Sequence, residues 1–243
     1  MRILLETAYC GSAYHGFQIQ PNADTIQARI EDALSKIYCT EIHIAGCSRT
    51  DAGVHAKCSF CQFDTDKPFD ISRLPDAVNA YLPKDICIIS ATEKGEDFHC
   101  RFCVKSKTYE YLIWNKHTRN PLYFERALHF PFALDAELMD KEAKDYIGTH
   151  DFAAFMAQGS PVESTVRTVH FAGVERDGDF VKFTVCGNGF LYNMVRIMVG
   201  TLMWVSLGKI EKGSIPEIIK SKDRKLAGPT VGPEGLYLAK VEY

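Results

Sequence analysis

The order of strand-like and helical segments is the feature that most limits how this chain can fold. In the first half, hydrophobic periodicity gives the order β-α-β-β-α-β. The segments lie near residues 2–9, 24–37, 42–47, 57–64, 73–82 and 86–92. The second half repeats this order, with an additional short helix near 214–221. Its other segments lie near residues 108–114, 135–147, 166–175, 180–186, 189–206 and 236–242.

This order is that of the ferredoxin-like fold, in which helices cover one face of an antiparallel sheet. We therefore predict an α+β chain with two ferredoxin-like halves, residues 1–103 and 104–243. A cleft between two such halves would be the natural place for an active site. Within the second half, Asp177-Gly178 predicts a tight hairpin turn.

Composition excludes several classes of protein. Of the 243 residues, 46% are hydrophobic and 24% are charged, which excludes a disordered, collagen-like or coiled-coil chain. No uncharged apolar run reaches the length of about 18 residues that a membrane span needs, and the first residues do not resemble a signal peptide. We therefore expect a cytoplasmic protein.

Charge is unevenly distributed along the chain. The net charge is −3, but residues 101–126 hold six basic against two acidic side chains. A basic segment on a mildly acidic protein could bind an RNA backbone, and it could equally be a solvated surface of mixed sign.

The nine cysteines include two closely spaced pairs, Cys58 with Cys61 and Cys100 with Cys103. A zinc knuckle needs a tight turn between its ligands, and neither pair has a glycine there. The first pair also lies in a strand-like run, where residues three apart point to opposite faces. We interpret the cysteines as free thiols and small core residues, and we predict no metal site.

The loop at residues 46–55 departs most from ordinary local patterns. It lies between two predicted strands and brings Arg49, Thr50, Asp51 and His55 together among small residues. Flanking glycines would let its backbone approach a ligand closely while the polar side chains converge. A turn in which Asp51 only caps backbone amides would fit the same pattern.

The apolar helix predicted near 189–206 carries Arg196 in its middle. A guanidinium in such surroundings needs a carboxylate, and Asp51 is the natural candidate from the other half. A structural ion pair, or a side chain that reaches solvent, would also satisfy Arg196.

Strand spacing puts Tyr109 and Tyr111 on one side of a sheet, either as ordinary sheet residues or as a platform for a flat base. Adjacent His150 and Asp151 fit a capping or packing role better than a catalytic dyad.

Six parts of the chain together resemble the TruA-type family of tRNA pseudouridine synthases. In chain order they are YCGSAYHGFQIQ with TIQARIEDAL, SRTDAGVHA, FHCRF with KTYEY, GTHDFAAF, GFLYNMVRIMVGTL and AGPTVGPEGLYL. The resemblance runs almost from end to end. It implies two ferredoxin-like halves around a cleft, a homodimer, tRNA as substrate at anticodon-arm positions 38–40, and no metal or organic cofactor.

The resemblance also assigns roles to individual residues. Asp51 matches the catalytic aspartate of the RTDAG motif, and Arg49 the arginine that helps to expose the target base. Tyr109 matches the tyrosine that stacks on the target uracil, and Arg196 the arginine that pairs with the catalytic carboxylate. Leu236, or Leu238 in the same GLYL segment, would form an apolar wall of the pocket.

Four positions depart from the family pattern without touching these roles. Ser48 replaces a usual glycine, Cys10 an aspartate, Lys107 an arginine and Cys100 an alanine. Ser48 and Lys107 affect the expected choice of target more than the expected reaction.

Two other functions remain open at this level. The β-α-β-β-α-β order also occurs in non-catalytic RNA-binding RRM domains, although KCSFCQF lacks their RNP1 pattern. A glycoside hydrolase would need a second carboxylate, and none accompanies Asp51 in its loop. Whether Asp51 would attack the base, attack the sugar or remove a sugar proton also remains open.

Overall fold

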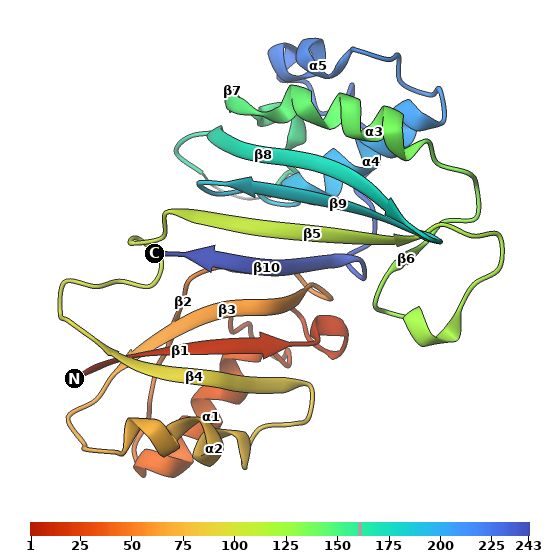
Figure 1. Cartoon of the computed structure of the whole chain (residues 1–243). Coiled ribbons are helices and arrows are strands. Elements are labelled where there is room, and N and C mark those ends of the chain that lie inside the picture. Colours follow the sequence, from red (N-terminus) through yellow and green to blue (C-terminus); the bar gives the residue numbers. More distant parts are fainter. Residues whose placement is uncertain (160–161) are drawn as a thin grey trace. The chain divides into compact units, whose positions relative to one another are not determined.

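The computed structural model describes residues 1–159 and 162–243 and divides the chain into two compact units (Figure 1). One unit comprises Met1–Lys105 with Tyr237–Tyr243, and the other comprises Ser106–Leu236. Helices and mainly antiparallel strands occur in both, which confirms the predicted α+β class. Residues 237–243, predicted as part of the second half, belong to the first unit. Among the described residues, no helix combines the length and apolarity needed to cross a bilayer.

The sheet of the first unit is built around β1 (Arg2–Tyr9). Strands β3 (His55–Asp64) and β4 (Ile86–Lys94) flank β1, and both run antiparallel to it. Helices α1 (Ile26–Tyr38) and α2 (Leu74–Asn79) pack against each other on one face of this sheet (Figure 1).

The outer edge of β3 is shared by two further strands. The two-residue strand β2 (Ala45–Gly46) pairs antiparallel near the end of β3. Strand β10 (Leu236–Glu242) pairs parallel with the beginning of β3, through Tyr237 and Leu238. Parallel neighbours need no tight turn between them, so a strand from the end of the chain can complete this sheet. That pairing explains why the last strand belongs to the first unit.

Helix α1 begins at Ile26, two residues after the predicted start near residue 24. Thr25 is the N-cap, and its hydroxyl accepts a hydrogen bond from the Ala28 amide at 3.3 Å. Asp24 forms an ion pair with Arg29 instead. The apolar face of the helix, which includes Ile26, Ile30, Ala33 and Leu34, is fully buried.

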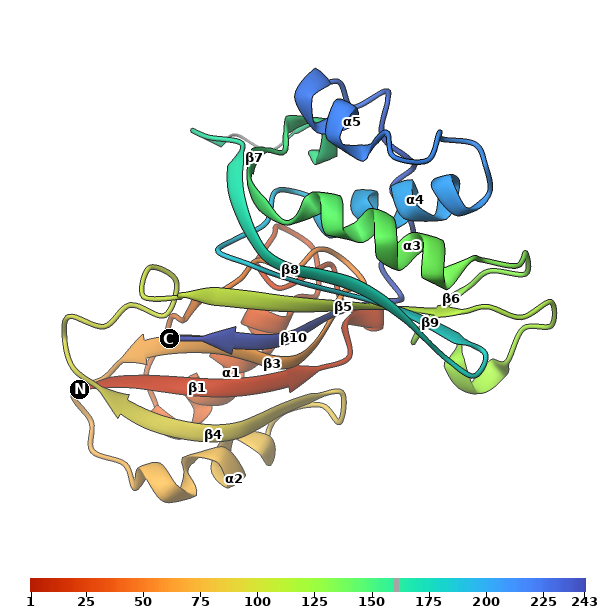
Figure 2. The same ribbon diagram turned by 45° about the horizontal axis from the view of Figure 1, so that its top comes forward.

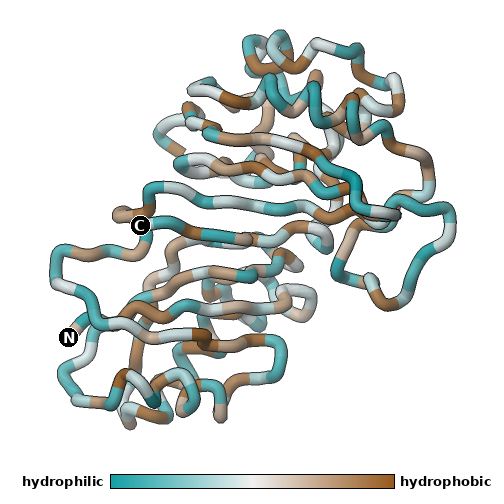
Figure 3. Tube along the Cα trace, viewed as in Figure 1, coloured by the Kyte–Doolittle hydropathy of each residue, from teal (hydrophilic) through white to brown (hydrophobic). Residues whose placement is uncertain are grey.

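The sheet of the second unit has the strand order β5-β9-β8-β7, with every neighbouring pair antiparallel. Their bounds are Ser106–Trp114 for β5, Phe180–Gly187 for β9, Val166–Asp177 for β8 and Gly148–Asp151 for β7. The two-residue strand β6 (Leu128–His129) pairs with the end of β5. The predicted hairpin at Asp177-Gly178 joins β8 to β9, with Gly178 at a φ of 56°. Polar and apolar residues mix along these strands (Figure 3), and Val181, Phe183 and Val185 of β9 are buried.

The described residues of the second unit include the helices α3 (Ala136–Ala143), α4 (Met194–Ser206) and α5 (Ile215–Ser221). Helix α3 packs against β8 and against α4 (Figure 2). Short 3₁₀ turns occur in both units, at Gly11–Ala13, Ile71–Arg73, Pro121–Tyr123, Lys144–Tyr146 and Ala153–Phe155.

In the second unit one predicted boundary is wrong, and one strand was missed. Helix α4 begins at Met194 rather than near residue 189, because Asn193 adopts a left-handed conformation with φ 59° that a right-handed helix cannot continue. Arg196 therefore lies in the first turn of the helix and not in its middle. Strand β7 was not predicted at all, since it is only four residues long and begins with a glycine, Gly148.

Asp151, predicted to cap or to pack, makes structural contacts within the second unit, while Phe152 is the N-cap of the 3₁₀ turn at Ala153–Phe155. One carboxylate oxygen accepts hydrogen bonds from the Thr165 hydroxyl at 2.5 Å and the Ala153 amide at 3.2 Å. The other oxygen forms an ion pair with Lys222 at 2.8 Å. Lys222 and Thr165 lower the pKa of Asp151 below its usual value. His150 is not directed into a dyad, because its ring nitrogen lies 3.0 Å from the Ile147 carbonyl oxygen.

We expect Asp151→Ala to lower the free energy of unfolding by about 1–2 kcal/mol at pH 7 through these lost contacts. Because the folded-state pKa lies below the unfolded value of about 3.9, the carboxylate stabilises the fold above that pH. This contribution is lost as pH falls through the folded-state pKa. Urea unfolding at pH 7 and at about pH 3 should therefore show the two proteins converging at the lower pH. Glu163→Ala, at an exposed position, serves as the control, and a pH-independent gap for Asp151→Ala would contradict the assignment.

Candidate active site

The loop that carries Asp51 connects β2 to β3 in the first unit. Within it, the Val54 amide donates to the Asp51 carbonyl oxygen at 3.1 Å, and Gly53 has a φ of 78°. Thr50 is buried, and its hydroxyl lies 2.8 Å from the hydroxyl of Tyr9. Asp51 is half-buried and Arg49 is exposed. The loop is thus anchored through Thr50 and leaves Asp51 partly accessible.

The segment after β1 holds this loop by backbone contacts. The Phe17 amide donates to the Thr50 carbonyl oxygen at 3.0 Å, and the Gly53 amide donates to the Tyr14 carbonyl oxygen at 3.3 Å. A side chain at residue 11 could not fit, because its Cβ would lie 2.0 Å from the Val54 carbonyl oxygen. The motifs YCGSAYHGF and SRTDAGVH are therefore two parts of one packed arrangement.

His55 was predicted to converge with the other polar side chains of the loop, but in the structure it links these two segments. Its side chain is 1% exposed, and its Nδ1 accepts a hydrogen bond from the Gly11 amide at 3.1 Å. This geometry puts the ring hydrogen on Nε2. The ring also stacks on Tyr237 of β10, with 4.6 Å between centroids and 24° between planes. His55 is therefore a positioning residue for the Asp51 loop. A histidine directly after a loop of small residues was the only signal for this role in the sequence.

Tyr109 and Tyr111 lie on β5 in the second unit. Tyr109 is 8% exposed, and its ring meets Phe190 edge-on with 5.2 Å between centroids. Tyr111 is fully buried, and its hydroxyl donates to the Gly232 carbonyl oxygen at 2.7 Å. Burial raises the pKa of Tyr111 well above its usual value, and the charge of Glu234 raises it further. Tyr111 is thus a core residue.

Arg196 projects from the first turn of α4 and is partly buried. Its Nε donates to the Val231 carbonyl oxygen, and its Nη1 donates to the Asn193 side-chain oxygen, both at 2.7 Å. Since Val231 adjoins Gly232, one loop accepts hydrogen bonds from both Arg196 and Tyr111. The same loop continues to the buried Leu236. The Val231 carbonyl of this loop and the Asn193 side chain therefore orient part of the guanidinium.

The predicted site residues are divided between the two units. Asp51 and Arg49 lie on one loop of the first unit, whereas Tyr109, Arg196 and Leu236 belong to the second. The pairing of Asp51 with Arg196 stays a prediction.

The cysteine pairs differ in part from their predicted role as core residues. Cys61 and Cys100 are fully buried, and burial raises the pKa of the Cys61 thiol. Cys58 is only half-buried, and Cys103 is exposed because it ends a surface turn. Within residues 1–159 and 162–243, no three His, Cys, Asp or Glu side chains are placed to hold a metal ion.

Comparison with known proteins agrees with the motifs. A family model described as tRNA pseudouridine synthase matches residues 7–103 and 143–243. The tRNA pseudouridine synthase A of Thermoanaerobacter sp. is 43% identical over 241 residues, which cover 99% of both chains. That of Acetivibrio thermocellus is 44% identical over 243 residues, covering 100% of this chain and 99% of the relative. One solved structure, of a Cbf5-Nop10-Gar1 complex, covers 83% of this chain and 54% of its own at 14% identity, but its TM-score of 0.34 is too low to support a conclusion.

The family match defines the class of protein as an RNA-modifying isomerase. The chain belongs to the tRNA pseudouridine synthase family, as the family model and the nearly full-length relatives show. The predicted function, an enzyme that isomerises uridine to pseudouridine in tRNA, is confirmed.

Proposed function

We propose that this protein modifies uridines at positions 38–40 in the anticodon arm of tRNA, with Asp51 as its catalytic group. The observation that supports this proposal best is the Asp51 loop itself. Thr50, Gly53 and His55 tie it to the segment after β1, while Asp51 remains partly accessible. A catalytic carboxylate needs both fixed position and access to substrate.

The reaction requires one carboxylate and no net redox change or hydrolysis. The N1–C1′ bond of uridine breaks, the uracil turns, and a C5–C1′ bond forms. The hydrogen on C5 leaves as a proton, and N1 gains one. An ionised Asp51 can act as nucleophile or stabilise positive charge that develops on the sugar, and it is regenerated at the end.

The other predicted residues surround this chemistry. Arg196 pairs with Asp51 and keeps it charged and oriented, as a bidentate guanidinium can. Tyr109 stacks on the target uracil, Arg49 helps to expose it, and Leu236 forms an apolar wall. The target nucleotide must leave its stack, which costs a few kcal/mol and less in a loop or at a stem end.

The finer features of the architecture belong to the same proposal. The two units correspond to two ferredoxin-like halves with the active site in a cleft, and the enzyme works as a cytoplasmic homodimer without a metal or organic cofactor. The order β4-β1-β3, with α1 and α2 on one face, is the arrangement in the first unit that supports this assignment.

Site mapping tests the proposed target. Unmodified tRNA transcripts that carry uridine at position 38, 39 or 40 would be incubated with the protein, and pseudouridine would be located by carbodiimide labelling and primer extension. We expect stops directly 3′ of these positions and next to no uridine elsewhere in the tRNA. Modification confined to another arm would contradict the assignment of the anticodon arm while leaving the isomerase intact.

A further inference from the structure

A surface pocket of about 270 Å³ lies in the first unit, beside the Asp51 loop. Arg49 lines it on one side, and the turn at residues 98–103 lines it on another through His99, Arg101 and Phe102. Phe17 and Gln27 also line it. None of the predicted site residues except Arg49 takes part. Its volume is near the lower end for small-ligand pockets, roughly 300 Å³, and suits a single nucleotide.

The turn at residues 98–103 is anchored through its central residue, Cys100, which is fully buried. The Cys100 amide donates to the Gln62 side-chain oxygen at 2.5 Å, and its thiol donates to the Ala45 carbonyl oxygen at 3.0 Å. The Tyr243 hydroxyl donates to the Cys100 carbonyl oxygen at 2.8 Å. These contacts fix the turn and leave Arg101 and Phe102 exposed at the surface.

Phe102 is exposed to an extent that is unusual for a fixed aromatic residue. It is 76% exposed, and the His99 ring lies beside it with 4.4 Å between centroids. The Arg101 guanidinium carbon lies 5.8 Å from the centre of the Phe102 ring. Aromatic rings beside cationic side chains are what proteins use to stack unpaired bases of single-stranded nucleic acid.

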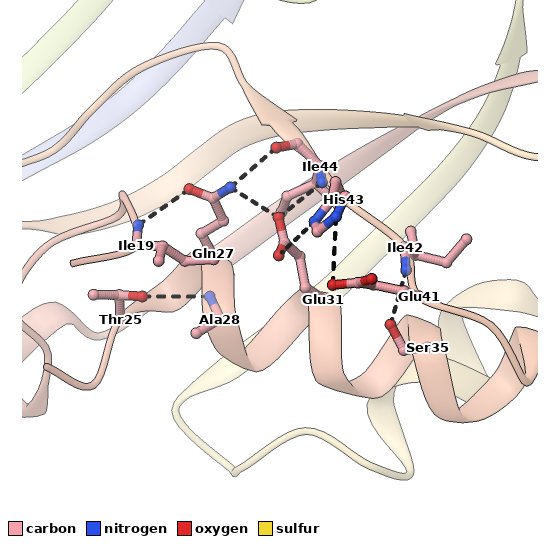
Figure 4. A network of polar contacts seen from close by, with 10 residues as sticks. All are labelled: Ile19, Thr25, Gln27, Ala28, Glu31, Ser35, Glu41, Ile42, His43 and Ile44. Atoms are coloured by element: carbon pink, nitrogen blue, oxygen red, sulfur yellow. Dashed lines mark hydrogen bonds and ion pairs between the residues drawn. The ribbon is translucent and has the colours of Figure 1, made fainter. Parts of the chain in front are cut away.

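Gln27 of α1, which lines the pocket, is held in place by a network of hydrogen bonds (Figure 4). Its amide nitrogen donates to Glu31 at 2.8 Å and to the Ile44 carbonyl oxygen at 3.1 Å, while its oxygen accepts from the Ile19 amide. The Glu31 carboxylate in turn accepts from the Ile44 amide at 2.9 Å. No acidic residue is among the described residues that line the pocket, whereas two arginines are. The pocket therefore favours an anionic ligand.

We propose that this pocket binds one unpaired nucleotide of the tRNA next to the target uridine, with its base stacked on Phe102 and its phosphate between Arg49 and Arg101. The proposal rests on the proposed function, because Arg49 is only two residues from Asp51 in the chain. A nucleotide held here would fix the register of the RNA relative to the catalytic loop. Phe102 and Arg101 are thus specificity-determining residues for the target.

Binding of an anticodon stem-loop RNA to Phe102→Ala tests the stacking contact. We expect a Kd about 5- to 100-fold weaker than wild type, the range for loss of one base stack. Phe102→Trp should bind this RNA with the wild-type Kd, because tryptophan can also stack on a base. Single-turnover isomerisation at subsaturating RNA should fall by a similar factor, because less RNA is bound. Tyr81→Ala removes another exposed aromatic of the same unit and is the matched control.

RNAs that lack a single base, scanned through the anticodon loop, then locate the contact. At one position next to the target, removal of the base should weaken wild-type binding and leave the Phe102→Ala variant unaffected. In Arg101→Ala, the dependence of binding affinity on salt concentration should fall by the amount that about one phosphate contact contributes. Arg101→Lys should keep the wild-type salt dependence. The proposal would be overturned if the Phe102→Ala variant bound RNA like wild type. It would also be overturned if, at every scanned position, removal of the base weakened binding by the same factor in the variant as in the wild type. Wild-type isomerisation, measured in parallel, would show separately whether the proposed function fails.

Discussion

The Asp51→Asn variant should bind tRNA with a Kd within a few-fold of the wild-type value. Its isomerisation rate should fall by at least roughly 10²–10⁴-fold, the range for removal of a positioned catalytic group. The two side chains have nearly the same size, and Asp51 is half-buried on a loop that is held through Thr50, Gly53 and His55 rather than through its carboxylate alone. The loop should therefore keep its shape while the negative charge and the nucleophile disappear. Single-turnover assays at saturating tRNA measure the loss of the chemical step.

The control for this substitution is Asp66→Asn, which makes the same chemical change at an exposed position of the same unit. It should leave turnover unchanged. An Asp51→Asn variant that retains more than about a tenth of wild-type turnover would remove Asp51 from the chemistry. Loss of tRNA binding together with turnover would instead show that its carboxylate serves to hold the RNA.

Gly200→Ala should lower the free energy of unfolding by about 2–3 kcal/mol, although alanine is the better helix former by about 1 kcal/mol. Gly200 lies inside α4, where a Cβ would stand 1.9 Å from the Pro229 carbonyl oxygen. That oxygen belongs to backbone, so the loop must move. Thr201 on the same helix accepts a hydrogen bond from the Gly228 amide at 2.9 Å, which ties the loop to this position.

Activity should fall with stability in this variant, because the displaced loop supplies the Val231 carbonyl oxygen that accepts from Arg196. Urea unfolding and single-turnover isomerisation measure the two effects. Gly189→Ala is the matched control in the same unit, where a Cβ would meet only ordinary contacts at 3.7 Å or more. Stability of Gly200→Ala equal to that of this control would contradict the close approach of the loop to α4.

The strands and helices were largely predictable from the sequence, because their hydrophobic periodicity is strong. The apolar face of α1 and the hairpin at Asp177-Gly178 are examples in which local pattern and packing agree. The start of α4 was not predictable in this way, since Asn193 in a left-handed conformation interrupts an apolar run that otherwise reads as helix. The place of β10 depends on its parallel pairing with β3, which no local pattern contains.

The candidate site was predictable in its residue types but not in its supports. The crowding of polar residues around Asp51 is visible in the sequence, and the resemblance assigns the roles. The reason for Gly11 appears only in the structure, where the Val54 carbonyl oxygen occupies the space of its missing side chain. The same is true of His55, and of Cys100 in the turn that presents Phe102. These roles depend on residues distant in the chain and therefore leave no periodic signal.

Tritium release from tRNA labelled at uridine C5 tests the central claim most directly. The wild-type protein would be incubated with an anticodon-arm transcript and with a matched transcript that carries cytidine at positions 38–40. We expect one tritium released for each pseudouridine formed on the first transcript, and none on the second. No release despite tight binding would leave an RNA-binding protein, and release of free uracil would show a glycoside hydrolase. Either of these results would contradict the account.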